Sequence, residues 1–177
     1  MTDTTEALRL HIGGETPKPG WTIVNIQPGA HVDVVGNCID LSCFGNSSVD
    51  AIYASHVLEH LGYLDELPQA LKEFRRVLKP GGRLMLSVPD LAVLCRLFLD
   101  ERLDIENRFH VMRIMFGGQM DPHDYHKAGM TADFMADYLT VAGFREVERV
   151  DGFGLFEDTS TLTVAGVPIS LNMQAVK

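Results

Sequence analysis

His56, Glu59 and His60 are the side chains in this sequence whose spacing most directly indicates chemistry, in the order His-x-x-Glu-His. Two imidazoles four residues apart on a helix project from one face and can share a zinc ion. The intervening carboxylate can activate a zinc-bound water. Zinc-dependent hydrolysis is therefore a first hypothesis, which the surrounding elements must support or exclude.

The elements around this group alternate between strand and helix. We expect strands at residues 8–12, 21–26, 32–36, 49–55, 83–88, 145–150 and 168–176, and helices at 64–78, 90–100, 111–116 and 131–142. Apolar residues at three- and four-residue steps mark the helix 64–78, and Pro80-Gly81-Gly82 ends it. Alternating strands and helices predict an α/β fold with a mostly parallel sheet.

A parallel sheet of this kind binds its ligand beyond the carboxyl ends of the strands. Gly13-Gly14, Ser55-His56 and Pro89-Asp90 each follow a predicted strand. We therefore expect these three pairs to lie close together, with the His-x-x-Glu-His group on the rim of a crevice.

The whole-chain properties limit the function classes. We expect the 177 residues to form a single domain, with residues 101–130 as a cap or insert over the substrate side. A net charge of −9 argues against nucleic acid as a partner. An acidic start, an odd number of cysteines and the lack of a long apolar run predict a cytoplasmic protein without membrane contact.

Two longer stretches carry a family resemblance. "VDAIYASHVLEHL" followed by "LKEFRRVLKPGGRLMLSVPD" resembles class I S-adenosylmethionine-dependent methyltransferases, and "RLHIGGETPKPGWTIVNI" is similar to their first motif. The resemblance implies a Rossmann-like sheet of seven strands with helices on both faces and an antiparallel last strand. In its weaker tail, "FGLFEDTS" and "ISLNMQAVK" would form the closing antiparallel pair.

This resemblance outweighs the zinc hypothesis. A zinc protease needs a further, distant carboxylate ligand and a larger chain, and we identify neither in the sequence. In the methyltransferase interpretation Glu59 holds loop amides and His60 is a packed or capping imidazole, so we expect no metal.

The resemblance implies S-adenosylmethionine as cofactor and places its binding residues. They are Gly13, Gly14, Trp21, Gln27, Asn37, Cys38 and Ser55. The glycines allow close backbone approach. Gln27 and Asn37 stand where the family carries acids for the ribose hydroxyls and the adenine amine, and an amide binds such donors more weakly than a carboxylate. Asp40 could compensate for Asn37 or could cap a local turn.

The connection between the first two strands also departs from the family. It has only nine residues, 13–21, whereas a crossover with a helix needs about a dozen. We therefore expect the usual first helix to be missing and the crevice to be open, with Trp21 covering part of it.

For methyl transfer the protein must hold the acceptor against the methyl group and, where needed, remove a proton. His56 is our first candidate for the base and Asp90 the second, while an equally good interpretation of His56 is a loop-ordering hydrogen bond. Residues 108–130 could be a solvated surface loop, a substrate cap using His110, Arg113 and His126, or a metal site.

The sequence thus predicts a methyltransferase acting on a small-molecule or sugar-containing acceptor. The alternative is a non-catalytic binding or assembly protein that keeps the methyltransferase fold but has lost the cofactor.

Overall fold

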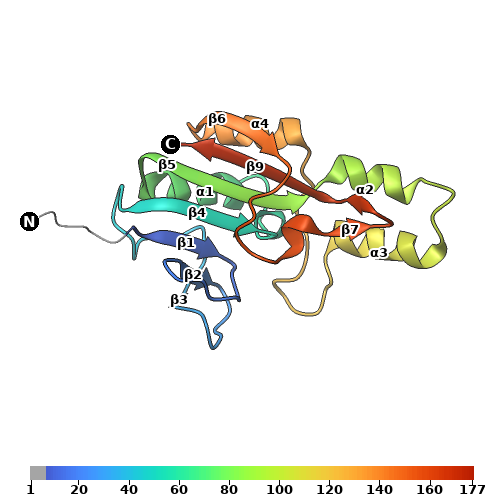
Figure 1. Cartoon of the computed structure of the whole chain (residues 1–177), viewed down its shortest axis with the longest axis horizontal. Helices are drawn as coiled ribbons and strands as arrows, with labels where there is room; N and C mark the ends of the chain where they lie inside the picture. Colours follow the sequence, from blue (N-terminus) through green and yellow to red (C-terminus); the bar gives the residue numbers. More distant parts are fainter. Residues whose placement is uncertain (1–6) are drawn as a thin grey trace, which may run out of the picture.

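A seven-stranded sheet organises the chain in the computed structural model, which describes residues 7–177 (Figure 1). Its order is β3-β2-β1-β4-β5-β9-β6. The strands are β1 (Arg9–Ile12), β2 (Thr22–Asn25), β3 (Val34–Val35), β4 (Val49–Ser55), β5 (Leu78–Pro89), β6 (Arg145–Val150) and β9 (Ser170–Val176). Only β9 runs against its neighbours β5 and β6. The predicted Rossmann-like sheet with an antiparallel last strand is confirmed.

Four α-helices and three shorter features complete the described chain. The helices are α1 (Glu66–Val77), α2 (Leu91–Phe98), α3 (Ile105–Phe116) and α4 (Ala132–Val141). The 3-10 turn η1 (Leu58–His60) precedes α1. The 3-10 turn η2 (Thr159–Thr161) and the small hairpin of β7 (Thr163–Val164) and β8 (Val167–Pro168) lie between β6 and β9. None of the helices in residues 7–177 is long and apolar enough to cross a bilayer.

One face of the sheet carries the main core. Alternate strand residues such as Ile52 and Leu86 point to this face and join one apolar cluster with the buried sides of α1 and α4. Phe74 of α1 and Leu139 of α4 are both fully buried in it. The periodicity that predicted α1 in the sequence is the stripe that packs here.

The opposite face is covered differently from our expectation of helices on both faces. Here the side chains of His11 and Tyr53 are covered by Phe156, whose ring stacks on Tyr53 at 5.1 Å and lies 4.0 Å from the His11 ring. Asn172 of β9 binds the carbonyls of Asp151 and Ser160. A non-helical segment, residues 151–162, is therefore the cover of this face.

The same segment corrects one prediction. The stretch "FGLFEDTS", residues 153–160, is not the partner of the last strand but loop followed by the start of η2. β6 pairs with β9 instead, from Arg145 opposite Val176 to Val150 opposite Asn172. The strand expected here was implied by the resemblance in its weaker tail, and the rings of this stretch instead cover a face of the sheet.

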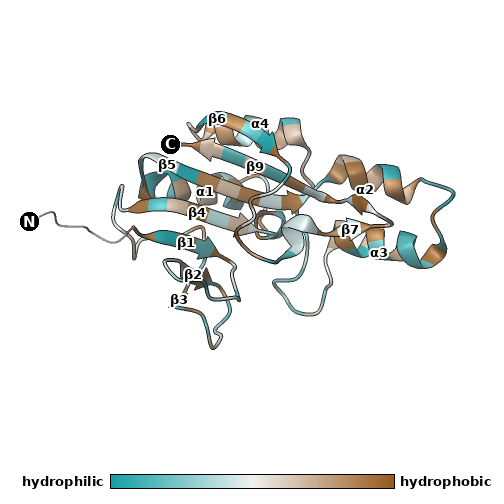
Figure 2. Cartoon of the chain, viewed as in Figure 1, coloured by the Kyte–Doolittle hydropathy of each residue, from teal (hydrophilic) through white to brown (hydrophobic). Residues whose placement is uncertain are grey.

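Helices α2 and α3 form a second, smaller cluster beyond the carboxyl end of β5 and the amino end of β9 (Figure 1). Val93, Leu94, Leu97 and Val111 pack there with Ile169. In Figure 2 the ribbon of α2 is mostly in the hydrophobic colour. Asp90 caps α2, accepting bonds from the amides of Ala92 and Val93.

The two edges of the sheet are short or irregular. β3 contributes only two residues to one edge. At the other edge the pairing of β6 shifts register between Arg145 and Glu148, where Glu146 has a positive φ of 51°. Between β1 and β2, residues 13–21 contain no helix, as their number predicted.

Candidate active site

A cavity of about 520 Å³ lies beyond the carboxyl ends of β1, β2 and β4, the edge at which parallel sheets bind ligands. Its size is within the range of about 300–1,000 Å³ that is usual for small-ligand sites. Residues from five separate segments line it: Ile12, Gly13, Glu15, Val24, Asn25, Ile26, Gln27, Gly36, Asn37, Cys38, His56, Val57, His60, Leu61, Glu66, Asp121, Pro122, His123, Asp124 and Lys127.

The cavity wall is more acidic than basic. The lining includes four carboxylates, those of Glu15, Glu66, Asp121 and Asp124, against the single ammonium of Lys127. Lys127 is itself paired with Glu66 at 2.9 Å. The remaining negative charge suits a ligand that carries positive charge.

The two glycines after β1 have different neighbours. Gly13 lines the cavity with a φ of +71°, and a Cβ built there would lie 2.4 Å from Cγ2 of Val57. Gly14 turns the other way, because its Cβ would meet the ring of His11 at 2.4 Å. Gly13 therefore fits the cavity wall to the turn after β4, while Gly14 makes room for the cover of the opposite face.

Gln27 and Asn37, the two amides at formerly acidic positions, both line the cavity and both already have partners within the protein. The Gln27 side chain donates to Asp121 Oδ2 at 3.2 Å, across the cavity. Asn37 Oδ1 accepts from the amide of Ile39 at 3.2 Å. Asp40 accepts from the amide of Ser42, which makes it a local turn residue.

Cys38 is a buried part of the wall, only 6% exposed. Burial raises the pKa of its thiol to about 12, so the group is neutral at physiological pH.

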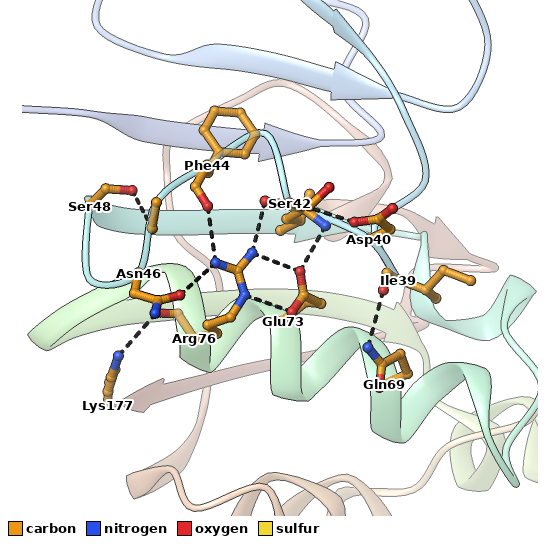
Figure 3. Close-up of polar contacts among 12 residues, drawn as sticks. Ile39, Asp40, Ser42, Phe44, Asn46, Ser48, Gln69, Glu73, Arg76 and Lys177 are labelled. Carbon is orange, nitrogen blue, oxygen red and sulfur yellow. Dashed lines mark hydrogen bonds and ion pairs between the residues drawn. The ribbon is translucent and has the colours of Figure 1, made fainter.

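A single arginine holds this side of the cavity in place (Figure 3). The Arg76 guanidinium of α1 donates to the carbonyls of Leu41 and Phe44 and to Asn46 Oδ1, and pairs with Glu73 at 2.7 Å. Glu73 in turn accepts from the amide of Leu41. These bonds fix the connection from β3 to β4, which has no helix of its own, and thereby position Asn37 and Cys38.

Asn25 and Glu15 are two polar cavity residues that the sequence did not single out. Asn25, at the end of β2, donates to the carbonyl of Gly14 at 3.2 Å and accepts from the amide of Gln27 at 3.0 Å. Glu15 lies directly after the glycine pair. Gln27 was selected because the family carries an acid at its position, and Asn25 lies two residues before it at the end of β2.

His56 lies on the cavity wall, but its ring is held by hydroxyl groups. Its φ of +53° turns the chain sharply after β4. Ser170 donates to the carbonyl of Thr159, so His56 Nε2 must donate to Ser170 at 3.3 Å, and Nδ1 accepts from Thr159 at 2.8 Å. Burial lowers the pKa of His56 to about 4. These contacts favour the loop-ordering interpretation over the general base.

Asp90 does not line the cavity. One carboxylate oxygen caps α2 and the other accepts from Arg149 at 2.9 Å, and the residue is 2% exposed. Both oxygens are therefore engaged in anchoring α2 to β6.

The remaining candidates are dispersed. Trp21 packs edge-on against Phe156 at 5.4 Å, in the cover of the opposite face, and Ser55 contacts the His56 ring at 3.3 Å. His110 and Arg113 are exposed on α3 and do not line the cavity. From the segment 108–130 it is instead residues 121–124 and Lys127 that reach it.

His126 lies next to the cavity in a separate cluster with Glu59 and His60. One ligand atom from each of the three lies within 4.8 Å of the others. Glu59 does hold two loop amides, those of Lys127 and Ala128, but through its main-chain carbonyl. Neither carboxylate oxygen has a hydrogen-bond partner among the described residues. Burial raises the pKa of Glu59 to about 8 and lowers that of His126 to about 4.

A parallel sheet in this strand order, with a cavity at its carboxyl ends, defines a protein of the class I methyltransferase fold. Residues 22–86 match the family model described as a methyltransferase domain. No curated protein matches the sequence significantly. The resemblance to S-adenosylmethionine-dependent methyltransferases is thereby confirmed.

Solved structures give the same fold at low identity. A SAM-dependent methyltransferase from Archaeoglobus fulgidus is 17% identical with a TM-score of 0.61, covering 97% of this chain and 86% of its own. A Burkholderia thailandensis 1,6-didemethyltoxoflavin-N1-methyltransferase, solved with bound 1,6-didemethyltoxoflavin and S-adenosylhomocysteine, is 18% identical with a TM-score of 0.59. The match covers 97% of this chain and 71% of that one. A methyltransferase from Haloferax volcanii in complex with the Trm112 activator is 13% identical with a TM-score of 0.53. The match covers 97% of this chain and 82% of that one.

Proposed function

We propose that the chain binds S-adenosylmethionine in the cavity beyond β1, β2 and β4 and transfers its methyl group to a small-molecule or sugar-containing acceptor. The observation that supports this best is the cavity itself, which has the position and size for such a cofactor and an acidic wall for its sulfonium charge. The match of residues 22–86 to a methyltransferase domain supports the same assignment.

In this proposal Gly13, Gln27, Asn37 and Cys38 contact the cofactor, because they line the cavity together. Gly14, Trp21 and Ser55 act indirectly through the cover of the opposite face and through His56. The protein's contribution to methyl transfer is positioning, since the sulfonium already activates the methyl carbon. His56 orders the turn after β4, and Asp90 anchors α2.

The acceptor reaches the cavity from the side of residues 117–127. Gly118 and Met120 donate their amides to the Asp124 carboxylate, and Gln27 ties Asp121 to the end of β2. We propose that this loop is the substrate-side cap within a single methyltransferase-like domain. His110, Arg113 and His126 would then contribute to substrate binding only through the position of this cap.

The test is calorimetric titration of the protein with S-adenosylmethionine and S-adenosylhomocysteine. We expect saturable binding to the wild type and about tenfold weaker binding to Gln27→Ala, which removes a cavity-lining amide. Gln174→Ala is the matched control, because this glutamine lies on β9 and pairs with Glu148 away from the cavity. Equal affinities of both variants would contradict the proposed cofactor position.

One observation favours a second candidate function, a binding or assembly protein of the same fold without cofactor. Gln27 and Asn37 stand where the family uses acids. The Gln27 side chain is bonded to Asp121 and the Asn37 side chain to the amide of Ile39, so both are already bonded within the protein. No heat of binding and no rise in melting temperature at millimolar cofactor would support this alternative.

A further inference from the structure

We propose that Glu59, His60 and His126 bind one divalent transition-metal ion of the zinc class, next to the cavity and open toward it. The cluster combines two imidazoles and a carboxylate from two segments, the turn η1 and the loop before α4, whose ligand atoms approach within 4.8 Å. This site is independent of cofactor binding, so it can be tested whether or not methyl transfer is the function.

The Glu59 carboxylate is the strongest observation. Glu59 is 1% exposed, and neither side-chain oxygen has a hydrogen-bond partner among residues 7–177. An unpaired polar group of this kind is costly to bury, and buried carboxylates are usually paired or coordinate a metal. Nε2 of His126 lies 3.9 Å from Oε1, which is too far for a hydrogen bond.

The two imidazoles are oriented as metal ligands are. Nδ1 of His60 faces the carbonyl of Tyr125 at 3.2 Å, so it donates there and leaves Nε2 with a free electron pair. Histidine ligands commonly use their second nitrogen in this way, which fixes the tautomer. The rings of His60 and His126 meet edge to face, with centroids 4.7 Å apart at 80°.

The main chain holds the two segments in register. The Glu59 carbonyl accepts from the amides of Lys127 and Ala128 at 2.8 and 3.2 Å, and the amide of His126 donates to the carbonyl of Phe116. His126, which brings the third ligand, directly precedes Lys127 in the sequence. The same bonds therefore fix the main chain next to it. Small side-chain rotations suffice for coordination, because ligands about 2.0–2.2 Å from zinc in a tetrahedron lie about 3.3–3.5 Å apart.

Three protein ligands leave a tetrahedral ion one open position, the arrangement of catalytic rather than structural zinc sites. His60 also lines the cavity, so an ion held by it would lie beside the cavity. An oxygen-bearing ligand in the cavity could bind there. His56, the other imidazole of the sequence pattern, is not a ligand in this site because Ser170 and Thr159 hold both its nitrogens.

The experiment is metal titration of the chelator-treated full chain. Zn²⁺ is added in competition with a chromogenic chelator, Co²⁺ is added to record the absorption bands of tetrahedral coordination, and Fe²⁺ is added anaerobically. We expect one Zn²⁺ per chain, a tetrahedral Co²⁺ spectrum and a higher melting temperature with metal. Tighter binding of Fe²⁺ than Zn²⁺ would overturn the assignment to the zinc class.

Variants test the ligand set. Glu59→Gln, His60→Gln and His126→Gln should each bind Zn²⁺ at least a hundredfold more weakly and lose the Co²⁺ spectrum. His123→Gln is the matched control, a cavity-lining imidazole of the same loop outside the cluster, and should bind as the wild type does. Circular dichroism of the metal-free variants verifies that they fold.

Two results would overturn the proposal. One is the absence of stoichiometric Zn²⁺ binding to the folded wild type at micromolar metal. The other is binding that survives both His60→Gln and His126→Gln, or that His123→Gln reduces equally. Because the readouts use no cofactor, a failed metal test leaves the proposed methyl transfer untouched, and a failed cofactor titration leaves the metal site untouched.

Discussion

The two faces of the sheet are stabilised in different ways. On one face, α1 and α4 bury a continuous apolar cluster that includes Phe74 and Leu139. On the other, residues 151–162 cover a smaller group in which polar side chains such as His11 and Asn172 are buried beside aromatic rings. The comparison teaches that short crossovers remove helices from one face only, and that a loop with a few rings can replace them.

The largest expected effect of a single substitution is on the helical face. Phe74→Ala should lower the free energy of unfolding by about 3–5 kcal/mol, because it removes a fully buried ring from the main cluster. Equilibrium urea unfolding measures this value. A loss below about 1 kcal/mol would mean that this face is not the main source of stability.

The next effect is a pH dependence on the loop-covered face. Burial lowers the pKa of His11 from 6.5 to about 4, so the folded protein holds this imidazole neutral. The unfolded chain takes up the proton first, and stability present above pH 6.5 is lost as pH falls from about 6.5 to 4. His11 alone should contribute a loss of roughly 3 kcal/mol at most.

The variant His11→Phe isolates this contribution. Its stability should fall less steeply than that of the wild type between pH 6.5 and 4, measured by denaturant unfolding at each pH. His31→Phe is the control, because this histidine is exposed in the loop before β3 and should leave the profile unchanged. Parallel profiles for His11→Phe and the wild type would show that His11 titrates normally.

The smallest effect is expected for the ring that covers His11. Phe156→Ala should cost about 1–2 kcal/mol, less than Phe74→Ala, because Phe156 is only partly buried. Amide hydrogen exchange should become faster in residues 151–162 and stay unchanged in α1. A uniform increase across both regions would mean that the two faces unfold as one unit.

Sequence periodicity was sufficient for the sheet and for the helical face. The stripe of α1 and the alternation of β1 and β4 arise from local geometry, so they are visible in one sequence. The loop that covers the other face could not be predicted in this way. Nothing local distinguishes a strand from a loop that places Phe153 and Phe156 on a distant sheet.

The candidate site shows the same difference between features that are local in the sequence and contacts that are not. Gly13, Gln27, Asn37 and Cys38 were placed at the cavity by the motif resemblance, which depends on short local stretches of sequence. Contacts between residues that are far apart in the sequence could not be predicted from the sequence. His126 meets Glu59 and His60 only through the loop before α4, and the positive φ of His56 directs that ring away from them. The sequence pattern thus named two of the three clustered residues but gave the wrong third.

The margins of the sheet have a consequence for behaviour at high concentration. A long, flat strand at a margin would expose unpaired amides and carbonyls to which another copy could add. Here one margin ends in the two residues of β3, and the other carries the register shift and the charges of β6, among them Arg145 and Glu148. Neither margin offers a regular template, so intermolecular β-pairing between native chains is disfavoured at both.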